Sequence, residues 1–379
     1  MAAVAELTDR AQNWASTMAG RPHAALRLAH ADSTAAVAPP RERQREEREA
    51  RQNDQLAEGA TPALGAGNRA TDEAPDPYRT CFERDRDRIL HSSAFRRLAG
   101  KTQVFVFPDD HQRTRLTHAL EVAQVARAVA ATLRLNTDLV EAIALGHDCG
   151  HGPGGHASED ALDPYVAEGY DHAVWGADVV LSPLNLCVET LDGIRNHSWS
   201  RPAPRTPEGE VVSWADRIAY VCHDFEDATQ AGLVTADDLP ALVQARCGPS
   251  RRTQLASFIA SMVQATAATG QIGMLEAEAE ALAEFRRFNY HHIYLRPSSV
   301  EQGERVITLL RALVEHFAER PDRLPTHWGD RGAEPSSEVA LRQAVTYVGG
   351  MTDRFACEVA GELLGFGVDR FPRGFDIRR

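Results

Sequence analysis

One short run of this chain is dense in side chains that bind metal ions. His147 and Asp148 are adjacent, and two further histidines, His151 and His156, follow soon after them. Core packing seldom requires so many imidazoles, whereas first-row transition metals take imidazole and carboxylate ligands. The run therefore predicts a metal site, at which a bound ion would act as a Lewis acid and activate water for hydrolysis.

Two residues outside the run, His118 and Asp216, complete a set of four ligands with His147 and Asp148. A histidine such as His118 is by itself more often structural, and an aspartate such as Asp216 is by itself more often solvated. The prediction therefore depends on the four residues together. Its members belong to three predicted helices, and helical bundles build internal metal sites from facing helices. We expect a divalent ion, with Mn, Mg, Fe, Co and Ni ahead of Zn.

The elements that must position these ligands are predicted to be helices. Apolar residues recur at helical spacing over 115–133 and along one broad face of 211–231. Residues 138–146 predict a buried helix that ends at the His147–Asp148 pair, where glycines and a proline break it. Helical patterns also cover later segments, namely 239–246, 255–269, 276–287, 300–320, 338–349 and 352–364. Strand patterns are scarce, so the fold is predicted to be all-α.

Composition narrows the class of protein. A formal net charge of −13 argues against a protein that coats nucleic acid non-specifically. Six cysteines without a Cys-x-x-Cys pair indicate free thiols in a reducing compartment. No apolar stretch approaches the ~20 residues that a membrane span needs, and residues 1–36 lack the features of a signal peptide. We expect a cytoplasmic protein with no membrane partner.

Three regions are expected along the chain. Residues 1–72 are rich in Ala, Arg, Glu and Gly and include a mixed-charge run at 41–49, which predicts a mostly disordered extension. Residues 73–235 would form the metal-dependent core. Residues 236–379 would form a C-terminal helical region packed on that core.

Several motifs together resemble one known superfamily. Four segments carry the likeness, namely 79–104, 115–123, 147–159 and 216–220. They are similar to HD-domain phosphohydrolases, and most of all to the deoxynucleoside triphosphate triphosphohydrolases, the bacterial dGTPase-like proteins and their mammalian SAM-and-HD-domain relative. The likeness covers roughly residues 78–234 and departs at Gly152 and Gly154, where the bacterial proteins usually have proline and phenylalanine.

The resemblance implies both a fold and a reaction. The fold would be an HD-domain helical bundle with additional C-terminal helices. The reaction would be metal-dependent hydrolysis of a deoxynucleoside triphosphate, dGTP or several dNTPs, to deoxynucleoside and inorganic triphosphate. The alternative is another HD-superfamily reaction on a monophosphate, cyclic or alarmone nucleotide, because the metal fixes the class of reaction but not the substrate.

Proton transfer at this site has three candidate residues. His156 and Glu159 lie at i and i+3, so in a helix the carboxylate can orient the imidazole and raise its basicity. His172 corresponds by resemblance to a further active-site histidine, a proton donor or a triphosphate contact. Without the resemblance, His172 would be interpreted as a surface residue at a helix start.

The triphosphate requires cations. Arg115 precedes His118 by one helical turn and should point along the same face. Arg217 and Lys101 lie beside motif residues, and structural ion pairs are the alternative role for such cations. By resemblance, His151 contacts a phosphate.

The sugar is assigned mainly by resemblance, which places Gln103 and Asp224 on the 3′-hydroxyl and Tyr220 against the ring. Tyr220 and Asp224 also follow Asp216 by one and two helical turns, which independently places them beside the metal. Base-recognition residues are not evident. Segment 290–296 is either a contributor or a buried aromatic patch.

The resemblance also implies partners. A dNTP is the expected substrate, a second dNTP is a candidate allosteric activator, and self-association into a homo-oligomer is expected. Single-stranded nucleic acid is a weaker candidate partner, whose binding would be an accessory property. A non-catalytic sensor or nucleic-acid-binding regulator would predict broken metal ligands or a basic surface, and the sequence has neither.

Overall fold

The computed structural model describes residues 8–326, 328–329 and 332–374. The chain divides into two compact units, 1–43 and 44–379. In the first, Thr8 caps helix α1 (Asp9–Ser16), and strands β1 (Arg21–His23) and β2 (Leu26–Leu28) pair antiparallel. None of the α1 residues is buried. The two short strands form the one sheet among the described residues.

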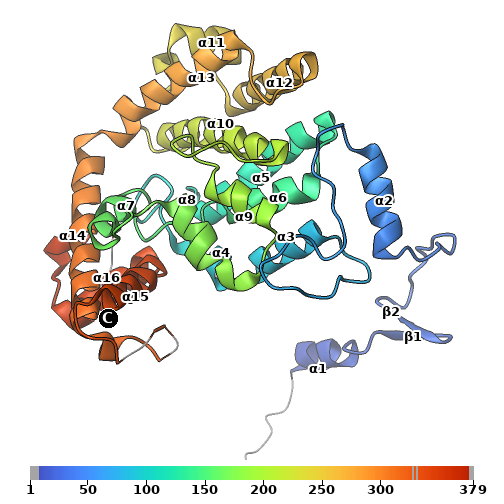
Figure 1. Ribbon diagram of the computed structural model, residues 1–379, viewed down its shortest axis with the longest axis horizontal. Helices are drawn as coiled ribbons and strands as arrows, with labels where there is room; N and C mark the ends of the chain where they lie inside the picture. The colour runs from blue at the N-terminus through green and yellow to red at the C-terminus, as the bar shows by residue number, and fades with distance from the viewer. Residues whose placement is uncertain (1–7, 327, 330–331, 375–379) are drawn as a thin grey trace, which may run out of the picture. The chain divides into compact units, whose positions relative to one another are not determined.

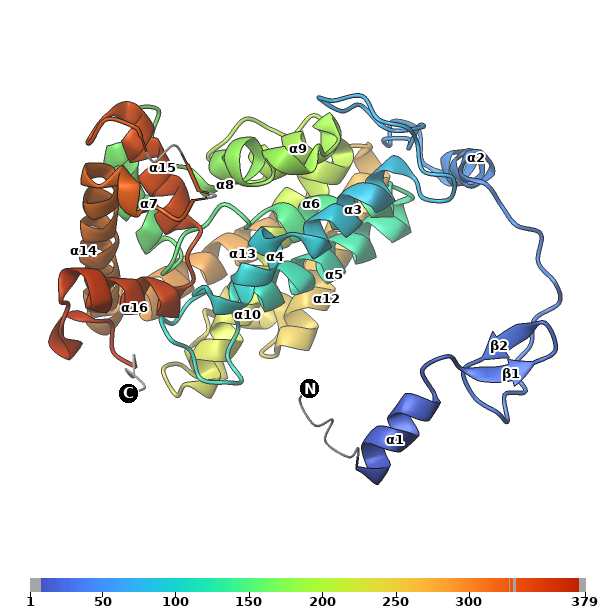
Figure 2. The ribbon, with the colours of Figure 1, turned by 90° about the horizontal axis from the view of Figure 1, so that it is seen from below.

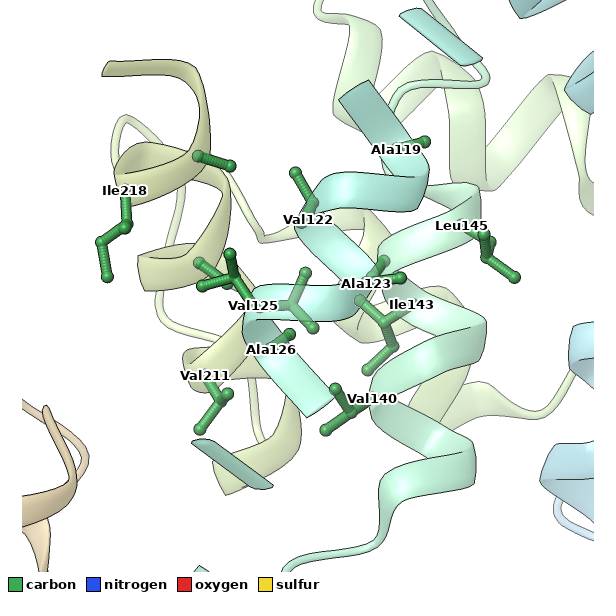
Figure 3. Close-up of a cluster of buried hydrophobic side chains, with 14 of the residues drawn as sticks. Ala119, Val122, Ala123, Val125, Ala126, Val140, Ile143, Leu145, Val211 and Ile218 are labelled. Carbon is green, nitrogen blue, oxygen red and sulfur yellow. The ribbon is translucent and has the colours of Figure 1, made fainter. Parts of the chain in front are cut away.

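Three helices make the centre of the second unit: α5 (Arg115–Leu133), α6 (Thr137–Gly146) and α10 (Pro207–Gln230). Alanine and valine dominate their contact face, as Figure 3 shows for Val122, Ala126 and Val211. Small side chains let the helix axes approach closely, so polar residues at the helix ends come within bonding distance of one another. Helices α3 (Cys81–His91) and α9 (Val188–Arg195) pack on α6.

The later helices form two groups (Figures 1 and 2). The first group packs beside α10 and comprises α11 (Ala241–Cys247), α12 (Arg251–Thr269) and α13 (Glu276–Asn289). The second has a hydrophobic core of its own and comprises α7 (Ala157–Leu162), α14 (Pro297–Glu319), α15 (Glu338–Gly349) and α16 (Asp353–Leu364). Both groups contribute to the site described below.

The remaining elements are short. They are α2 (Arg45–Gln55), α4 (Ser93–Arg97), α8 (His172–Trp175), the π-helical segments η3 (Gly176–Val180) and η6 (Tyr290–Tyr294), and the 3-10 turns η1 (Leu98–Gly100), η2 (Asp163–Tyr165), η4 (Ser182–Leu184), η5 (Ala236–Asp238), η7 (Pro321–Arg323) and η8 (Val368–Arg370). None of the described helices combines the length and apolar character that a membrane crossing needs.

The prediction of an all-α fold is confirmed, and the helices expected from periodicity are present with ends that differ by a few residues. The structure differs within the expected disordered extension, because residues 44–72 belong to the second unit. Arg69 Nη1 lies 2.6 Å from Oδ1 of the buried Asp85, and Thr61 N donates to Glu208 Oε1 at 3.0 Å. Polar contacts of this kind leave no apolar periodicity in the sequence, so composition alone suggested disorder.

Candidate metal centre and substrate pocket

The four predicted ligands converge from three helices. His118 lies in the first turn of α5, His147 and Asp148 directly follow α6, and Asp216 lies on α10. His118, His147 and Asp148 each offer a ligand atom within 4.8 Å of the others, and His147 and Asp216 belong to a second such group. The candidate ligands of α5, α6 and α10 therefore meet at the C-terminal end of α6.

The geometry fits a divalent ion. His147 Nδ1 donates to Ala144 O at 2.7 Å, which leaves a lone pair on Nε2, and this buried nitrogen has no hydrogen-bond partner. His147 Nε2 lies 3.4 Å from Asp148 Oδ1 and 3.6 Å from Asp216 Oδ1. His118 Nε2 lies 3.0 Å from the same oxygen of Asp216. Two imidazole nitrogens and two carboxylates thus face one point, which is a donor set that transition metals accept.

Both aspartates are held as carboxylates. Burial raises the pKa of Asp148, but Arg115 and the neighbouring histidines outweigh it and hold that pKa well below its usual range. Burial likewise opposes ionisation of Asp216, and His118 and His147 lower its pKa on balance. Anionic oxygens are the form that binds a metal ion.

Arg115 supports the metal centre and also faces the pocket. Its buried side chain donates from Nη1 to Asp148 Oδ2 at 2.7 Å, while its Nε and Nη2 atoms have no partner. The guanidinium therefore fixes one candidate ligand and keeps two donors for an anion.

Glu159 contacts His156, as sequence spacing suggested, and also a second histidine, His172. Its Oε1 accepts from His172 Nδ1 and, at 3.1 Å, from His172 N. His156 Nδ1 is 3.6 Å from Glu159 Oε2, and the His156 side chain is 76% exposed. His156 precedes α7 and Asp171 caps α8, so the carboxylate in the first turn of α7 points at the start of α8.

A histidine that the sequence analysis missed completes this cluster. His197 Nδ1 donates to Ile194 O at 2.8 Å, and its Nε2 lies 3.2 Å from His172 Nε2. The His151 ring stacks on the His172 ring with centroids 3.7 Å apart, and His151 Nε2 is 3.2 Å from Asp148 Oδ1. His197 lies between α9 and α10 at no helical spacing from the others. No motif and no predicted helix in the sequence singled it out.

These groups border a cavity of about 630 Å³. Eleven sequence-predicted site residues line it, namely Gln103, Arg115, His118, Asp148, His151, His156, His172, Asp216, Arg217, Tyr220 and Asp224. His147 and Glu159 do not line the cavity; they contact residues that do.

The cavity lining also includes the residues that resemblance assigns to a sugar. Asp224 Oδ2 accepts from Tyr294 OH at 2.5 Å, and its buried Oδ1 has no partner. Burial raises the pKa of Asp224 to about 7. Gln103 Oε1 is also buried without a partner, and Tyr220 OH accepts from Arg286 Nε at 2.6 Å. Tyr294 belongs to the π-helical η6, and the wide turn of such segments often occurs at functional sites.

Lys101 has a structural role rather than the cationic role considered from the sequence. It is buried, and its Nζ donates to His151 O and, at 2.9 Å, to Gly349 O. Burial lowers its pKa to about 7. Asp353 acts beside it, since Oδ1 accepts from Gly154 N at 2.8 Å and Oδ2 accepts from Thr102 N at 2.9 Å. The loop after His147–Asp148 is therefore held from α15 and α16.

Comparison with known proteins agrees with this architecture. Residues 115–221 match the HD domain, and residues 272–362 match the phosphohydrolase-associated domain. The fold and the histidine–aspartate cluster thus define an HD-domain phosphohydrolase.

Two curated relatives narrow the family. The chain is 38% identical to the deoxyguanosinetriphosphate triphosphohydrolase-like protein of Caldanaerobacter subterraneus subsp. tengcongensis, over 79% of this chain and 90% of that protein. It is also 38% identical to the protein of the same description from Desulfatibacillum aliphaticivorans, over 82% and 95% of the two chains. A solved structure of a hypothetical protein from Aquifex aeolicus aligns at 18% identity and a TM-score of 0.45, covering 77% of this chain and 71% of that one. The chain belongs to the deoxyguanosinetriphosphate triphosphohydrolase-like family.

Proposed function

We propose that this protein is a metal-dependent dNTP triphosphohydrolase, which cleaves dGTP or several dNTPs to deoxynucleoside and inorganic triphosphate. The observation that carries the proposal is the convergence of His118, His147, Asp148 and Asp216 beside a cavity of about 630 Å³, which Asp224 also lines with an unpartnered carboxylate oxygen. The relatives' names supply the substrate class. A cavity of this size suits a nucleotide.

His118, His147, Asp148 and Asp216 would hold the ion. When bound, a divalent ion supplies Lewis-acid polarisation of a phosphoryl oxygen and lowers the pKa of water. The chain's own part is to fix the ligands, and it does so through Arg115 on Asp148 and through Ala144 O on His147. Ligands held in this way need little rearrangement when the ion binds.

The triphosphate would be bound by Arg115, Arg217 and His151. Arg115 offers Nε and Nη2, and Arg217 offers Nε, and none of these donors has a hydrogen-bond partner. Donors without competing partners in a partly desolvated pocket bind an anion strongly. This supports assigning the metal end of the cavity to the phosphates.

Departure of the 5′-oxygen requires a proton, and His172, Glu159 and His156 are the proposed catalytic groups. Burial lowers the pKa of His172, but Glu159 outweighs burial and raises it on balance. An imidazolium beside the scissile bond can donate a proton, and Glu159 holds its orientation. His156, exposed at the pocket, is placed to exchange protons with solvent.

The sugar would lie against Tyr220, with its 3′-hydroxyl near Asp224 and Gln103. Both of the latter have a buried oxygen that lacks a donor, and a hydroxyl group would supply one. Leaving such acceptors unpaired costs about 1–3 kcal/mol each, which favours substrates that reach them.

Product analysis tests the proposal. Purified protein is incubated with each dNTP and Mn²⁺, and the phosphorus products are resolved by ³¹P NMR. We expect tripolyphosphate and deoxynucleoside in equal amounts. Release of orthophosphate or pyrophosphate instead would contradict the reaction and favour another HD-superfamily activity. The same panel, repeated with mixed dNTPs, tests activation by a second nucleotide.

A further inference from the structure

Trp199 is an aromatic residue of the cavity lining to which neither the sequence nor the proposed reaction gave a role. It lies in the segment between α9 and α10, and 45% of its surface is exposed. Its indole Nε1 donates to Ser213 O at 3.2 Å, and its ring meets the Trp214 ring edge to face with centroids 4.7 Å apart. Ser213 Oγ in turn donates to His197 O. A half-exposed indole is thus held in one orientation by two contacts, and one of its partners, Ser213, is itself fixed.

The face of this indole carries a guanidinium. Arg217 Cζ lies 3.6 Å from the Trp199 ring centroid. Among the residues that the structure describes, Arg217 makes no hydrogen bond and no ion pair, and its Nε is buried without a partner. Most other arginines near the core, such as Arg69 and Arg113, pair with carboxylates. Arg217 is therefore a cation positioned by a π face and not by an anion.

The type of support matters for what Arg217 can bind. A carboxylate partner would neutralise the guanidinium and compete with an incoming phosphate. An aromatic face fixes the planar group through the ring quadrupole and leaves its charge and its donors available. Arg217 also directly follows the candidate ligand Asp216 near the middle of α10, and Asp224 lies two turns further along.

We propose that Trp199 is a positioning residue for the triphosphate end of the substrate, which holds the Arg217 guanidinium in the cavity without neutralising it. This inference rests on the proposed function for the identity of the anion. It assigns no role to Trp199 in proton transfer or metal binding. The predicted signature is a loss of substrate affinity with the chemical step preserved.

Steady-state kinetics of Trp199→Leu and Trp199→Phe provide the test. We expect W199L to raise KM by about 3- to 10-fold, with kcat changed by less than about twofold, since a cation–π contact of this kind is worth that much in binding. W199F retains a π face and should stay close to wild type. Trp328→Leu is the matched control, because Trp328 also faces an arginine, Arg97, but lies outside the cavity lining. Equal KM values for W199L and wild type would overturn the inference.

Two further measurements keep the test decisive. If circular dichroism shows that W199L does not fold, Arg217→Lys with Trp199 intact replaces it. Lysine keeps the charge but lacks the planar group that lies on the ring, so R217K should raise KM by a similar factor, and a wild-type KM would refute the role of the stack.

Calorimetric titration with inorganic tripolyphosphate separates the two proposals. Wild-type protein that binds tripolyphosphate more tightly than W199L but hydrolyses no dNTP would contradict the proposed function and leave the Trp199 inference intact. Normal dNTP hydrolysis with equal tripolyphosphate affinity in both proteins would contradict the Trp199 inference and leave the proposed function intact.

Discussion

At the scale of single residues, Asp148 combines two roles that mutation can separate. It faces His147 Nε2 and also accepts a hydrogen bond from the buried Arg115. We expect Asp148→Ala to abolish metal binding, measured by metal analysis of the purified protein, and to lower hydrolysis at least about 100-fold. The same change should reduce the free energy of unfolding by about 3–5 kcal/mol, because it leaves a buried guanidinium unpaired.

The double variant Arg115→Met/Asp148→Leu distinguishes these roles. Replacing both charges by apolar groups removes the unpaired cation, so urea unfolding should show a stability well above that of the single variant. Metal should remain absent. Full metal content in either protein would contradict the assignment of Asp148 as a ligand.

Asp224 gives a prediction about pH. Burial raises its pKa to about 7 in the folded protein, well above the value of an exposed aspartate. Between about pH 4 and pH 7 the folded state therefore holds a proton that the unfolded state has released, so this residue's contribution to stability falls as the pH rises. We expect Asp224→Asn to stabilise the protein relative to wild type by about 1–3 kcal/mol more at pH 8 than at pH 5.5.

Thermal unfolding at the two pH values provides the measurement for Asp224, with the exposed Asp237→Asn as a control that should show no such difference. D224N should also raise KM for dNTPs, because an amide replaces the carboxylate that would accept the 3′-hydroxyl. A pH-independent effect of D224N on stability would show that the carboxyl does not carry this proton.

Residues that share a helix were predictable from the sequence, and partners brought together by tertiary contacts were not. Tyr220 and Asp224 line the cavity with Asp216, and their spacing from Asp216 is a property of α10 alone. The partner of Asp224, Tyr294, comes from η6, and the position of η6 depends on how α13 packs. His197 and the pairing of Glu159 with His172 escaped for the same reason. The periodicity of a sequence within one helix carries no information about contacts between separate elements.

At the scale of elements, the segment after α6 must pass very close to α8. A Cβ atom on Gly150 would lie 1.9 Å from His172 O, a backbone atom that cannot move aside. We therefore expect Gly150→Ala to displace α8 and His172 and to lower the free energy of unfolding by more than about 3 kcal/mol. Chemical denaturation measures this change.

Gly303 in α14 is the contrasting position for Gly150. A Cβ atom there meets no atom closer than 4.0 Å, so Gly303→Ala should stabilise the helix by about 0.5–1 kcal/mol. Equal effects of the two substitutions would show that the contact between the segment after α6 and α8 is not tight.

Periodicity was sufficient to predict α5 and α6 because each has a continuous apolar stripe. It failed for α2, whose buried residues are Arg45 and Glu49, ion-paired at 2.5 Å. A polar helix that packs through a buried ion pair has the composition of a solvent-exposed segment. Its position becomes evident only when its partners are known.

At the scale of the whole molecule, two truncations should behave differently. Deleting residues 1–43 removes a compact unit with its own contacts, so we expect the unfolding temperature and the activity to stay unchanged. Deleting residues 1–72 also removes Arg69 and leaves Asp85 buried without its cation. That deletion should cost about 3–5 kcal/mol, measured by urea unfolding. Equal stability of the two truncated proteins would contradict the packing of residues 44–72.

Asp353 has a consequence for protein engineering. Its carboxylate lies in the phosphohydrolase-associated region. It binds the backbone at Thr102, which precedes α5, and at Gly154, which follows α6. Residues of both family regions also line one cavity, so the two regions are not exchangeable modules. A chimera that takes residues 272–362 from a relative also takes that relative's residue at position 353. We expect it to be active only if that residue can still bind the backbone at residues 102 and 154.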